Sequence, residues 1–453
     1  MSLSTDQTSP SMLLRFSGSN IRSFRDEFTL SLLATRVAEP GAARSIPWRE
    51  GGTDIDVLPT ALVLGANASG KSNLLRAMAD LRSFVLHSFR RGDPNGGVPR
   101  RYFQLDPAGQ AKPTMFEIDL VLGGVRHEYR VELDDERVLV ERLVRYPKGK
   151  ESLLFDRRRD EIEFGPSLRS RGRIIGELLR PNASFLSTAA ATNDEVLLPL
   201  YAWFSRNLLL AEAHNRHLRT ARSAELLEDR ARAEKALAML HAADLGISGV
   251  KKRPLDPETR DRVRRAVLIL QGREGEPDGS EADSLKIEEY GIALVHQSES
   301  GTCELDPQDE SLGTLVWLGL LGPVMDALEN GTVLLADELD ASLHPVLVER
   351  LVRLFQDPRT NPNRAQLISN AFDLHLVAAT SDRRLIGRDQ IWFTSKLVDG
   401  SSRLYPLLDF DPRRDENISR RYVQGMYGAI PLTTQAEFEA ALTPLGGMTG
   451  ARN

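Results

Sequence analysis

Residues 65–72 read Gly65-Ala-Asn-Ala-Ser-Gly-Lys-Ser72 and match the pattern G-x-x-x-x-G-K-[ST] of a phosphate-binding loop, or P-loop. The apolar run Thr60 to Leu64 precedes this loop, and a helical pattern with apolar residues at positions 74, 78, 81 and 85 follows it. A strand, a glycine-rich loop and a helix in this order form a cradle of backbone N–H groups for phosphate. The stretch therefore predicts an α/β fold with a nucleotide site at the start of the helix.

Each polar group of the P-loop has an expected task. The glycines let the backbone turn its N–H groups inward, and the helix N-terminus adds partial positive charge. The Lys71 ammonium is expected to neutralise the β- and γ-phosphates, and the Ser72 hydroxyl is expected to ligate Mg²⁺. ATP and Mg²⁺ are thus the predicted cofactors. The residues expected to bind the nucleotide here are Gly65, Asn67, Ser69, Gly70, Lys71, Ser72 and Asn73.

The bulk composition is that of a soluble globular protein. The 453 residues are 41% hydrophobic and 27% charged, and the length allows two or three domains' worth of core. The net charge of −6 argues against a globally basic nucleic-acid binder, although a local basic groove stays open. The single cysteine, Cys303, excludes an intramolecular disulfide and a cysteine-rich metal site, and it favours a reducing compartment.

The sequence shows no targeting or membrane segment. Its first ten residues lack the apolar stretch and basic start of a signal peptide, and residues 1–11 are predicted to be a disordered leader. The longest apolar run, Leu312 to Met325, contains glycine and proline and is too short to span a bilayer. We therefore predict a cytoplasmic location without membrane association.

Hydrophobic patterning indicates one α/β core interrupted by a large insertion. Residues 12–190 are predicted to hold the P-loop and an antiparallel β meander at 114–145, in which Gly123-Gly124 marks a hairpin turn. Residues 191–250 are rich in strong helix formers and are predicted to be a helical insertion subdomain. Residues 251–453 are predicted to complete the head that carries the P-loop.

The run Val333 to Ala336 is followed by Asp337 and Glu338, as in a buried strand whose end presents carboxylates (Walker B). Asp337 is expected to hold Mg²⁺ through water, and Glu338 is expected to orient or deprotonate the attacking water. Lys71 and Glu338 are therefore the predicted catalytic residues. Such a strand end is common by chance, but the P-loop in the same chain makes it the second half of an ATP site. Asp340 follows at the D-loop position of ABC-type ATPases.

The segment Glu310 to Thr314 lies about twenty residues before Walker B, at the spacing of the ABC signature. In that signature a serine hydroxyl and glycine amides at a helix N-terminus bind the γ-phosphate of ATP held by a partner subunit. Ser311 and Gly313 are the candidates here. Leu312 stands where glycine usually follows the serine, and Ser-Leu-Gly-Thr alone is an ordinary helix cap, so both interpretations stay open.

These segments resemble the AAA/ABC-type ATPases of prokaryotic defence loci, of the RloA and AbiL abortive-infection kind, which are relatives of RecF and SMC heads. The resemblance spans residues 12 to 431 and rests on 16–24, the P-loop, 310–314, 337–345, 389–393 and 421–431. It implies an α/β fold: an ABC-type (SMC/RecF-like) P-loop NTPase head with an antiparallel β meander and a helical insertion.

The resemblance also implies how the site is completed. Two heads are expected to close around two ATP molecules, as a homodimer or a higher homo-oligomer, with Ser311 and Gly313 acting across the interface. Asn20 and Arg22 are expected near the base or ribose. Gln104, in Tyr102-Phe-Gln-Leu105, is the candidate for the Q-loop glutamine.

One position departs from the pattern of this family. A switch histidine is usual after the strand that follows Walker B, and Phe372 stands there instead. Phenylalanine cannot hydrogen-bond a γ-phosphate. His375 is an alternative, although a capping or core role is favoured for it. We therefore predict firm ATP binding and slow hydrolysis.

Two functions compete. The first is an anti-phage, abortive-infection ATPase that senses or gates a separate effector, by resemblance a TOPRIM-like nuclease or another toxin. The second is a RecF-like DNA-maintenance ATPase, in which the basic segments 90–101 and 156–160 contact nucleic-acid phosphates. A transporter ATPase subunit is disfavoured because the meander and the helical insertion do not suit it.

Overall fold

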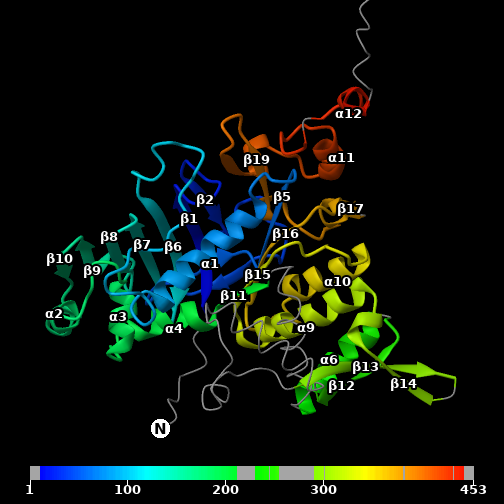
Figure 1. The fold of residues 1–453 in the computed structure, drawn as a ribbon, viewed down its shortest axis with the longest axis horizontal. Helices are drawn as coiled ribbons and strands as arrows, with labels where there is room; N and C mark the ends of the chain where they lie inside the picture. The colour runs from blue at the N-terminus through cyan, green and yellow to red at the C-terminus, as the bar shows by residue number, and fades with distance from the viewer. Residues whose placement is uncertain are drawn as a thin grey trace, which may run out of the picture.

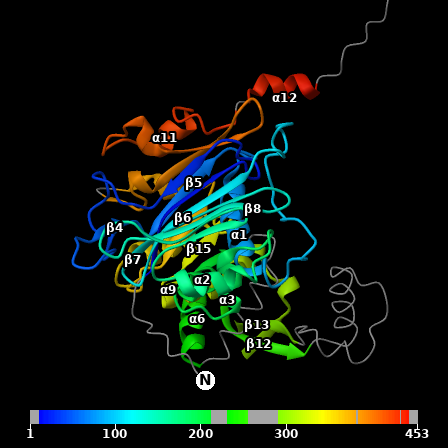
Figure 2. The same ribbon diagram turned by 90° about the vertical axis from the view of Figure 1, so that its left-hand side faces the viewer.

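The computed structural model describes residues 11–211, 230–243, 245–254, 290–299, 301–380, 383–431 and 433–442. The predicted disordered leader lies outside these residues except for Ser11. Two large sheets dominate the structure, with helices between and around them (Figure 1 and Figure 2).

The central sheet is built from short apolar strands, as expected for parallel strands that are covered on both faces. Its order is β11-β15-β16-β5-β19-β20, and every neighbouring pair is parallel except β19–β20. The P-loop strand β5 and the Walker B strand β15 therefore end at the same edge, with β16 between them. The strands are β5 Thr60–Gly65, β11 Leu208–Ala211, β15 Val333–Ala336, β16 Gln366–Asn370, β19 Ile391–Lys396 and β20 Ser402–Pro406.

Alternate residues of β5 pack into two different hydrophobic cores. Ala61 and Val63 belong to the first core, which contains helix α1 (Lys71–His87) and the second large sheet. Leu62 and Leu64 belong to the other core, with α9 (Leu312–Asn330) and α10 (Pro345–Gln356). Figure 1 shows α1 on one side of the central sheet and α9 and α10 on the other. The helix that starts at the P-loop is thus enclosed between two sheets.

Helix α9 is long and apolar enough to cross a membrane by the measures of length and hydropathy. However, 72% of its most apolar window is buried inside the protein, as in the core helix of a soluble protein. Ser311 caps its first turn and Gly331 ends it in the left-handed conformation, at φ 65°. Burial of its apolar residues by the second core therefore accounts for its composition.

The second large sheet is antiparallel, in the order β10-β9-β8-β7-β6-β1-β2. Gly123 and Gly124 form the turn between β6 and β7 at φ 61° and 72°, so the predicted hairpin is confirmed. Two further strands, β9 and β10, extend the meander beyond the predicted runs. The strands are β1 Met12–Ser19, β2 Phe28–Ser31, β6 Thr114–Leu122, β7 Val125–Leu133, β8 Val138–Arg145, β9 Ser152–Arg158 and β10 Glu161–Phe164.

The region predicted to be a helical insertion, 191–250, is not helical throughout. Helix α4 (Leu198–Arg206) packs in the first core, and α6 (Arg230–Ala242) lies against α9, where Arg232 pairs with Asp326. Between these helices, β11 forms the edge strand of the central sheet beside β15. Residues 212–229 lie outside the described residues. The region thus contributes a strand to the central sheet.

Smaller elements complete the described chain. They are the helices α2 Arg169–Gly176, α3 Phe185–Ala191, α11 Ile418–Val423 and α12 Gln435–Leu442, and the strands β3 Arg44–Ile46, β4 Ile55–Val57, β12 Ile247–Pro254, β13 Tyr290–Ser298, β14 Gly301–Leu305, β17 Ala379–Thr380 and β18 Arg383–Arg384. Strands β12, β13 and β14 form a separate three-stranded sheet.

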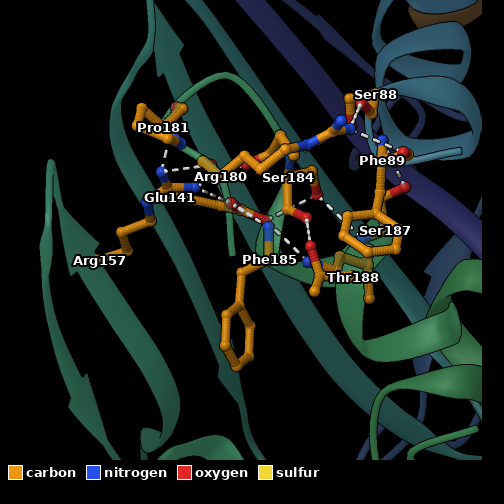
Figure 3. Close-up of polar contacts among 12 residues, drawn as sticks. Ser88, Phe89, Glu141, Arg157, Arg180, Pro181, Ser184, Phe185, Ser187 and Thr188 are labelled. Carbon is orange, nitrogen blue, oxygen red and sulfur yellow. Dashed lines mark hydrogen bonds and ion pairs between the residues drawn. The ribbon is translucent and has the colours of Figure 1, made fainter. Parts of the chain in front are cut away.

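A buried polar cluster ties the far end of α1 to the antiparallel sheet (Figure 3). Glu141 of β8 is fully buried and accepts hydrogen bonds from the backbone N–H groups of Phe185 (2.7 Å) and Leu186 (3.1 Å), at the N-terminus of α3. Arg180 donates to the carbonyl oxygens of Ser88 (3.0 Å) and Phe89 (2.7 Å), just beyond the end of α1. The P-loop helix is therefore fixed at both ends.

Candidate nucleotide-binding site

The two P-loop glycines are required by close packing at the end of β5. A Cβ atom at residue 65 would lie 2.5 Å from the carbonyl oxygen of Thr394. Gly70 has φ 111°, a left-handed conformation, and a Cβ atom there would overlap the Ser402 hydroxyl. Thr394 and Ser402 belong to β19 and β20. The P-loop is therefore shaped by a hairpin more than 300 residues away in the sequence.

A cavity of about 990 Å³ opens at the P-loop. Besides the P-loop, its walls come from the turn after β1, the segment 101–105, the hairpin between β19 and β20, and three residues that follow β15 and β16, namely Glu338, Ala341 and Phe372. Of the predicted site residues, those that line the cavity are Arg22, Asn67, Ser69, Gly70, Lys71, Ser72, Asn73, Gln104 and Glu338. Those that do not are Asn20, Gly65, Ser311, Gly313, Asp337 and Asp340.

Lys71 is buried and folded back on its own loop. Its Nζ atom donates to the carbonyl oxygens of Gly65 (2.7 Å) and Ala66 (3.0 Å) and lies 3.8 Å from the centre of the Phe372 ring. Burial lowers the pKa of Lys71 to about 8, although nearby carboxylates, among them Asp340, act to raise it. Phosphate oxygens would offer this ammonium a stronger partner than two carbonyl groups.

The lowered pKa of Lys71 predicts a pH-dependent ATP affinity. In the free protein the ammonium loses its proton as pH rises through about 8, whereas bound phosphates favour the charged form. Above pH 8 binding must therefore take up a proton, and the affinity should fall by up to about tenfold per pH unit. The measurement is the Kd for ATP between pH 7 and 9.5, under conditions without turnover. Lys71→Arg is the control, because arginine stays charged and should remove the slope. If the Kd of the wild type for ATP were equally independent of pH, the assignment of Lys71 as the phosphate-binding cation would be contradicted.

The Walker B carboxylates are held apart by the backbone. Asp337 is buried, and its Oδ1 atom accepts a hydrogen bond from Asn370 Nδ2 at 2.6 Å. Glu338 is exposed, lines the cavity and has a left-handed backbone with φ 55°. This unusual conformation lets consecutive acids point in different directions. Glu338 lines the cavity, whereas the buried Asp337 carboxylate lies between Asn370 and Arg76, whose Nη2 atom is 3.5 Å from Asp337 Oδ2.

Asp340 lies outside the cavity and holds a loop of its own chain. Its Oδ2 atom accepts hydrogen bonds from the backbone N–H groups of Phe372 (2.7 Å) and Asp373 (2.6 Å). Phe372 is half exposed and lines the cavity, whereas His375 is exposed and does not line it. The position expected for a switch histidine therefore presents an aromatic ring to Lys71.

Asn20 and Arg22 play different parts in the turn after β1. The Asn20 side chain is buried, donates to the carbonyl oxygens of Gly109 (2.8 Å) and Lys112 (2.9 Å), and accepts from the N–H of Phe103 (3.1 Å). These bonds place Asn20 behind the cavity wall, so its position favours support of the 101–105 segment over contact with a nucleotide. Arg22 lines the cavity and makes a two-pronged ion pair with Asp80 of α1 (2.6 and 2.7 Å).

The proposed signature residues lie on an exposed face. The Ser311 hydroxyl accepts a hydrogen bond from the N–H of Thr314 at 3.1 Å, which is ordinary helix capping. Gly313 packs closely on the D-loop, because a Cβ atom there would lie 2.8 Å from the carbonyl oxygen of Ser342. Ser311 and Gly313 do not line the cavity of their own chain.

Several cavity residues carry no sequence motif. Ser23, Arg101, Lys396 and Gly400 come from turns whose roles depend on the folded hairpins. Ser23 belongs to no recognisable sequence motif. In the structure, its hydroxyl accepts a hydrogen bond from Asn73 Nδ2 at 2.9 Å. Asn370 was also not predicted, because a polar residue that ends a strand gives no distinctive pattern.

The P-loop and the Walker B strand in one parallel sheet, with a serine-capped helix packed on the D-loop, define a P-loop NTPase head of the ABC type. The predicted fold class is thereby confirmed. A model of the family described as "AAA domain, putative AbiEii toxin, Type IV TA system" matches residues 61–369, which is more than half of the chain. The protein belongs to this family, whose P-loop implies nucleotide binding.

Solved structures of SMC heads are similar over most of the chain. The SMC head domain from Thermotoga maritima is 13% identical with a TM-score of 0.35, and the match covers 87% of this chain and 98% of that one. The Smc head domain with an extended coiled coil bound to the C-terminal domain of ScpA, derived from Pyrococcus furiosus, is 13% identical with a TM-score of 0.34, covering 92% and 100%. No curated protein matches the sequence at a significant level.

Proposed function

We propose that the protein binds and hydrolyses ATP as an ABC-type ATPase and regulates a separate effector in prokaryotic anti-phage (abortive infection) defence. The observation that carries the ATPase proposal is the cavity itself. It joins Lys71, a phosphate-binding cation, to Glu338, an exposed carboxylate that can orient or deprotonate water. The reaction would be slow because Phe372 offers no hydrogen bond to the γ-phosphate.

The residues around this cavity suit a magnesium ion as well as phosphates. Ser72 lines the cavity, and the buried carboxylate of Asp337 has one oxygen held by Asn370 and the other 3.5 Å from Arg76 Nη2, a long contact that a metal ion would replace. Hydroxyl and carboxylate oxygens are the ligands that Mg²⁺ prefers. When bound with ATP, the ion would neutralise phosphate charge during phosphoryl transfer.

The exposed position of Ser311 and Gly313 supports a site shared by two copies of the chain. A helix N-terminus attracts phosphate, and this one does not line the cavity of its own chain. A second copy that presented the same face to the cavity would complete the site. We therefore propose an ATP-dependent homodimer or higher homo-oligomer, acting in the cytoplasm.

The regulatory role rests on the family and on the chemistry within the described residues. Those residues contain no cluster of three or more His, Cys, Asp or Glu that could hold a metal ion. A TOPRIM-like nuclease or another toxin would therefore be a separate chain. The family description, which names a putative toxin and a toxin–antitoxin system, supports a role in such a pair.

The RecF-like alternative is weakened by where the basic side chains lie. Arg157 is fully buried and donates to the carbonyl oxygen of Ala183 at 2.7 Å, so it cannot contact DNA. Arg100 has a buried side chain and pairs with Asp135 at 2.7 Å. Both arginines belong to the segments that suggested nucleic-acid binding, and they give that alternative no support. The exposed arginines of the same segments are Arg90, Arg91, Arg101, Arg158 and Arg159.

The proposal is tested with the purified full chain and with the products of the adjacent genes. We expect Mg²⁺-dependent ATP turnover by the chain alone, no cleavage of DNA or RNA by it, and toxicity only when an adjacent gene product is also present. Nucleic-acid cleavage by the chain alone, lost in Glu338→Gln, would overturn the regulatory role. Absence of ATP binding would overturn the ATPase assignment.

Phe372→His is expected to raise the rate of ATP hydrolysis. The new imidazole would occupy the position of a ring that now stacks over Lys71 and could donate a hydrogen bond to the γ-phosphate. We expect an increase in kcat of about tenfold, which is less than the roughly hundredfold or more that a fully positioned polar group supplies. Steady-state phosphate release measures it, with Phe372→Leu as the apolar control. Equal rates for the two variants would count against a switch role for this position.

A further inference from the structure

Asn370, the last residue of β16, is fully buried beside both Walker B acids. Its Nδ2 atom donates to Asp337 Oδ1 at 2.6 Å, and its Oδ1 atom accepts from the backbone N–H of Glu338 at 2.5 Å. Its own carbonyl oxygen accepts from the N–H of Leu339 at 3.2 Å. Three consecutive residues after β15 are thus bound to one residue of the neighbouring strand.

The chemistry of this position admits an amide and little else. The carboxylate of Asp337 needs a donor, and the N–H of Glu338 needs an acceptor. Asparagine supplies both from one short planar group, whereas aspartate has no donor when it is ionised and leucine has neither group. The parallel register sets the distance, because Ala336 of β15 pairs with Ser369 of β16. Asn370 therefore follows directly beside Asp337.

The backbone of Glu338 makes this support necessary. A left-handed conformation is unfavourable for a residue with a side chain, and Glu338 adopts it at φ 55°. The hydrogen bond from the Glu338 N–H to Asn370 helps to hold that conformation, and with it the direction of the carboxylate. The same amide binds one of the two oxygens of Asp337, and Arg76 Nη2 lies 3.5 Å from the other.

We propose that Asn370 is the positioning residue of the ATPase site, fixing Asp337, the proposed metal ligand, and Glu338, the proposed base, through one side-chain amide. This inference rests on the proposed ATPase function. In this interpretation, the polar side chain that positions the Walker B acids is at the end of β16. The predicted switch position, which Phe372 occupies, does not have this role.

Asn361 provides a matched control in the same protein. It is also a buried asparagine whose amide bridges backbone groups, donating to the carbonyl oxygens of Phe355 (2.9 Å) and Ala365 (2.8 Å) and accepting from the N–H of Ala365 (2.7 Å). It lies before β16, whereas Asn370 ends that strand beside the Walker B acids. Asn361→Asp should therefore lower Tm without changing the positions of Asp337 and Glu338.

The experiment compares Asn370→Asp, Asn370→Leu and Asn361→Asp in the full chain. Three quantities are measured: Tm, the Kd for ATP with and without Mg²⁺, and kcat against KM for ATP. For both Asn370 variants we expect kcat to fall by about a hundredfold. We also expect that the Mg²⁺ concentration that gives half of the Mg²⁺-dependent decrease in the Kd for ATP will rise by about tenfold. The Kd without Mg²⁺ should change by less than about threefold, because the P-loop is intact.

The outcomes distinguish failure of the positioning role of Asn370 from failure of the proposed ATPase function. If the Asn370 variants lose Tm as Asn361→Asp does but keep the wild-type kcat and Mg²⁺ dependence, Asn370 is only structural and the inference is overturned. If the wild type itself does not bind Mg²⁺ and ATP, the proposed function fails, and the inference falls with it. Even in a wild type with no measurable turnover, the Mg²⁺-dependent Kd distinguishes these results.

Discussion

Lys71→Ala should abolish measurable ATP binding while leaving the fold intact. The Lys71 ammonium lies at the P-loop carbonyl groups where phosphates would bind, and charge-assisted hydrogen bonds to phosphate contribute about 1.5–3 kcal/mol each. Loss of two such bonds predicts at least about a hundredfold weaker binding. Isothermal titration or displacement of a fluorescent ATP analogue measures the change.

The expected stability of this variant sharpens the test. Burial lowers the pKa of Lys71 to about 8, so the protein pays a desolvation cost to keep this residue charged at neutral pH. Removing it should leave Tm without ATP unchanged or higher, and it should remove the rise in Tm that ATP causes in the wild type. Lys112→Ala removes an exposed lysine that does not line the cavity and serves as the control. Undiminished ATP affinity in Lys71→Ala would refute the P-loop assignment.

Glu338→Gln should nearly stop hydrolysis and cause an ATP-bound dimer to accumulate. The exchange removes the base from an exposed position in the cavity but keeps the backbone N–H that Asn370 holds. A positioned general base contributes about 10²- to 10⁴-fold, so kcat should fall within that range while ATP affinity is retained. Single-turnover measurement gives the rate, and size-exclusion chromatography with light scattering gives the mass.

Glu349→Gln is the matched control for this variant. Glu349 is an exposed carboxylate of α10 that pairs with Arg353 at 2.7 Å and does not line the cavity. Its exchange should leave turnover and mass unchanged. If Glu338→Gln bound ATP and remained monomeric, the shared site completed by Ser311 of a second copy would be wrong, although ATP binding by the single chain would stand.

Local chemistry made the P-loop, the Walker B strand and the hairpin at Gly123-Gly124 predictable. Each of these features is set by a few consecutive residues: glycines with positive φ, or an apolar run that ends in acids. By contrast, β11 has only four residues, too few to show a period, and it follows a helical pattern. Its strand conformation comes from pairing with β15, which lies more than 120 residues downstream.

The unpredicted parts of the site have the same origin. Asn370 matters because the register of β15 and β16 brings it to Asp337, and no pattern within β16 reveals that register. Asn20 belongs to a segment that does resemble a nucleotide-binding turn, but its amide is already bonded to the backbone of 103–112. Sequence identified the residue types of the site, and tertiary pairing decided which of them face the cavity.

The anchoring of α1 at both ends has a mechanical consequence. Its first turn carries the P-loop, and the carbonyl groups beyond its last turn are held by Arg180, next to the segment that Glu141 fixes to β8. Because the same hydrophobic core spans α1 and both sheets, the helix cannot tilt without dragging the meander with it. A displacement of α1 at the nucleotide would therefore also move the segment around Ser88 and Phe89, which Arg180 holds next to the antiparallel sheet.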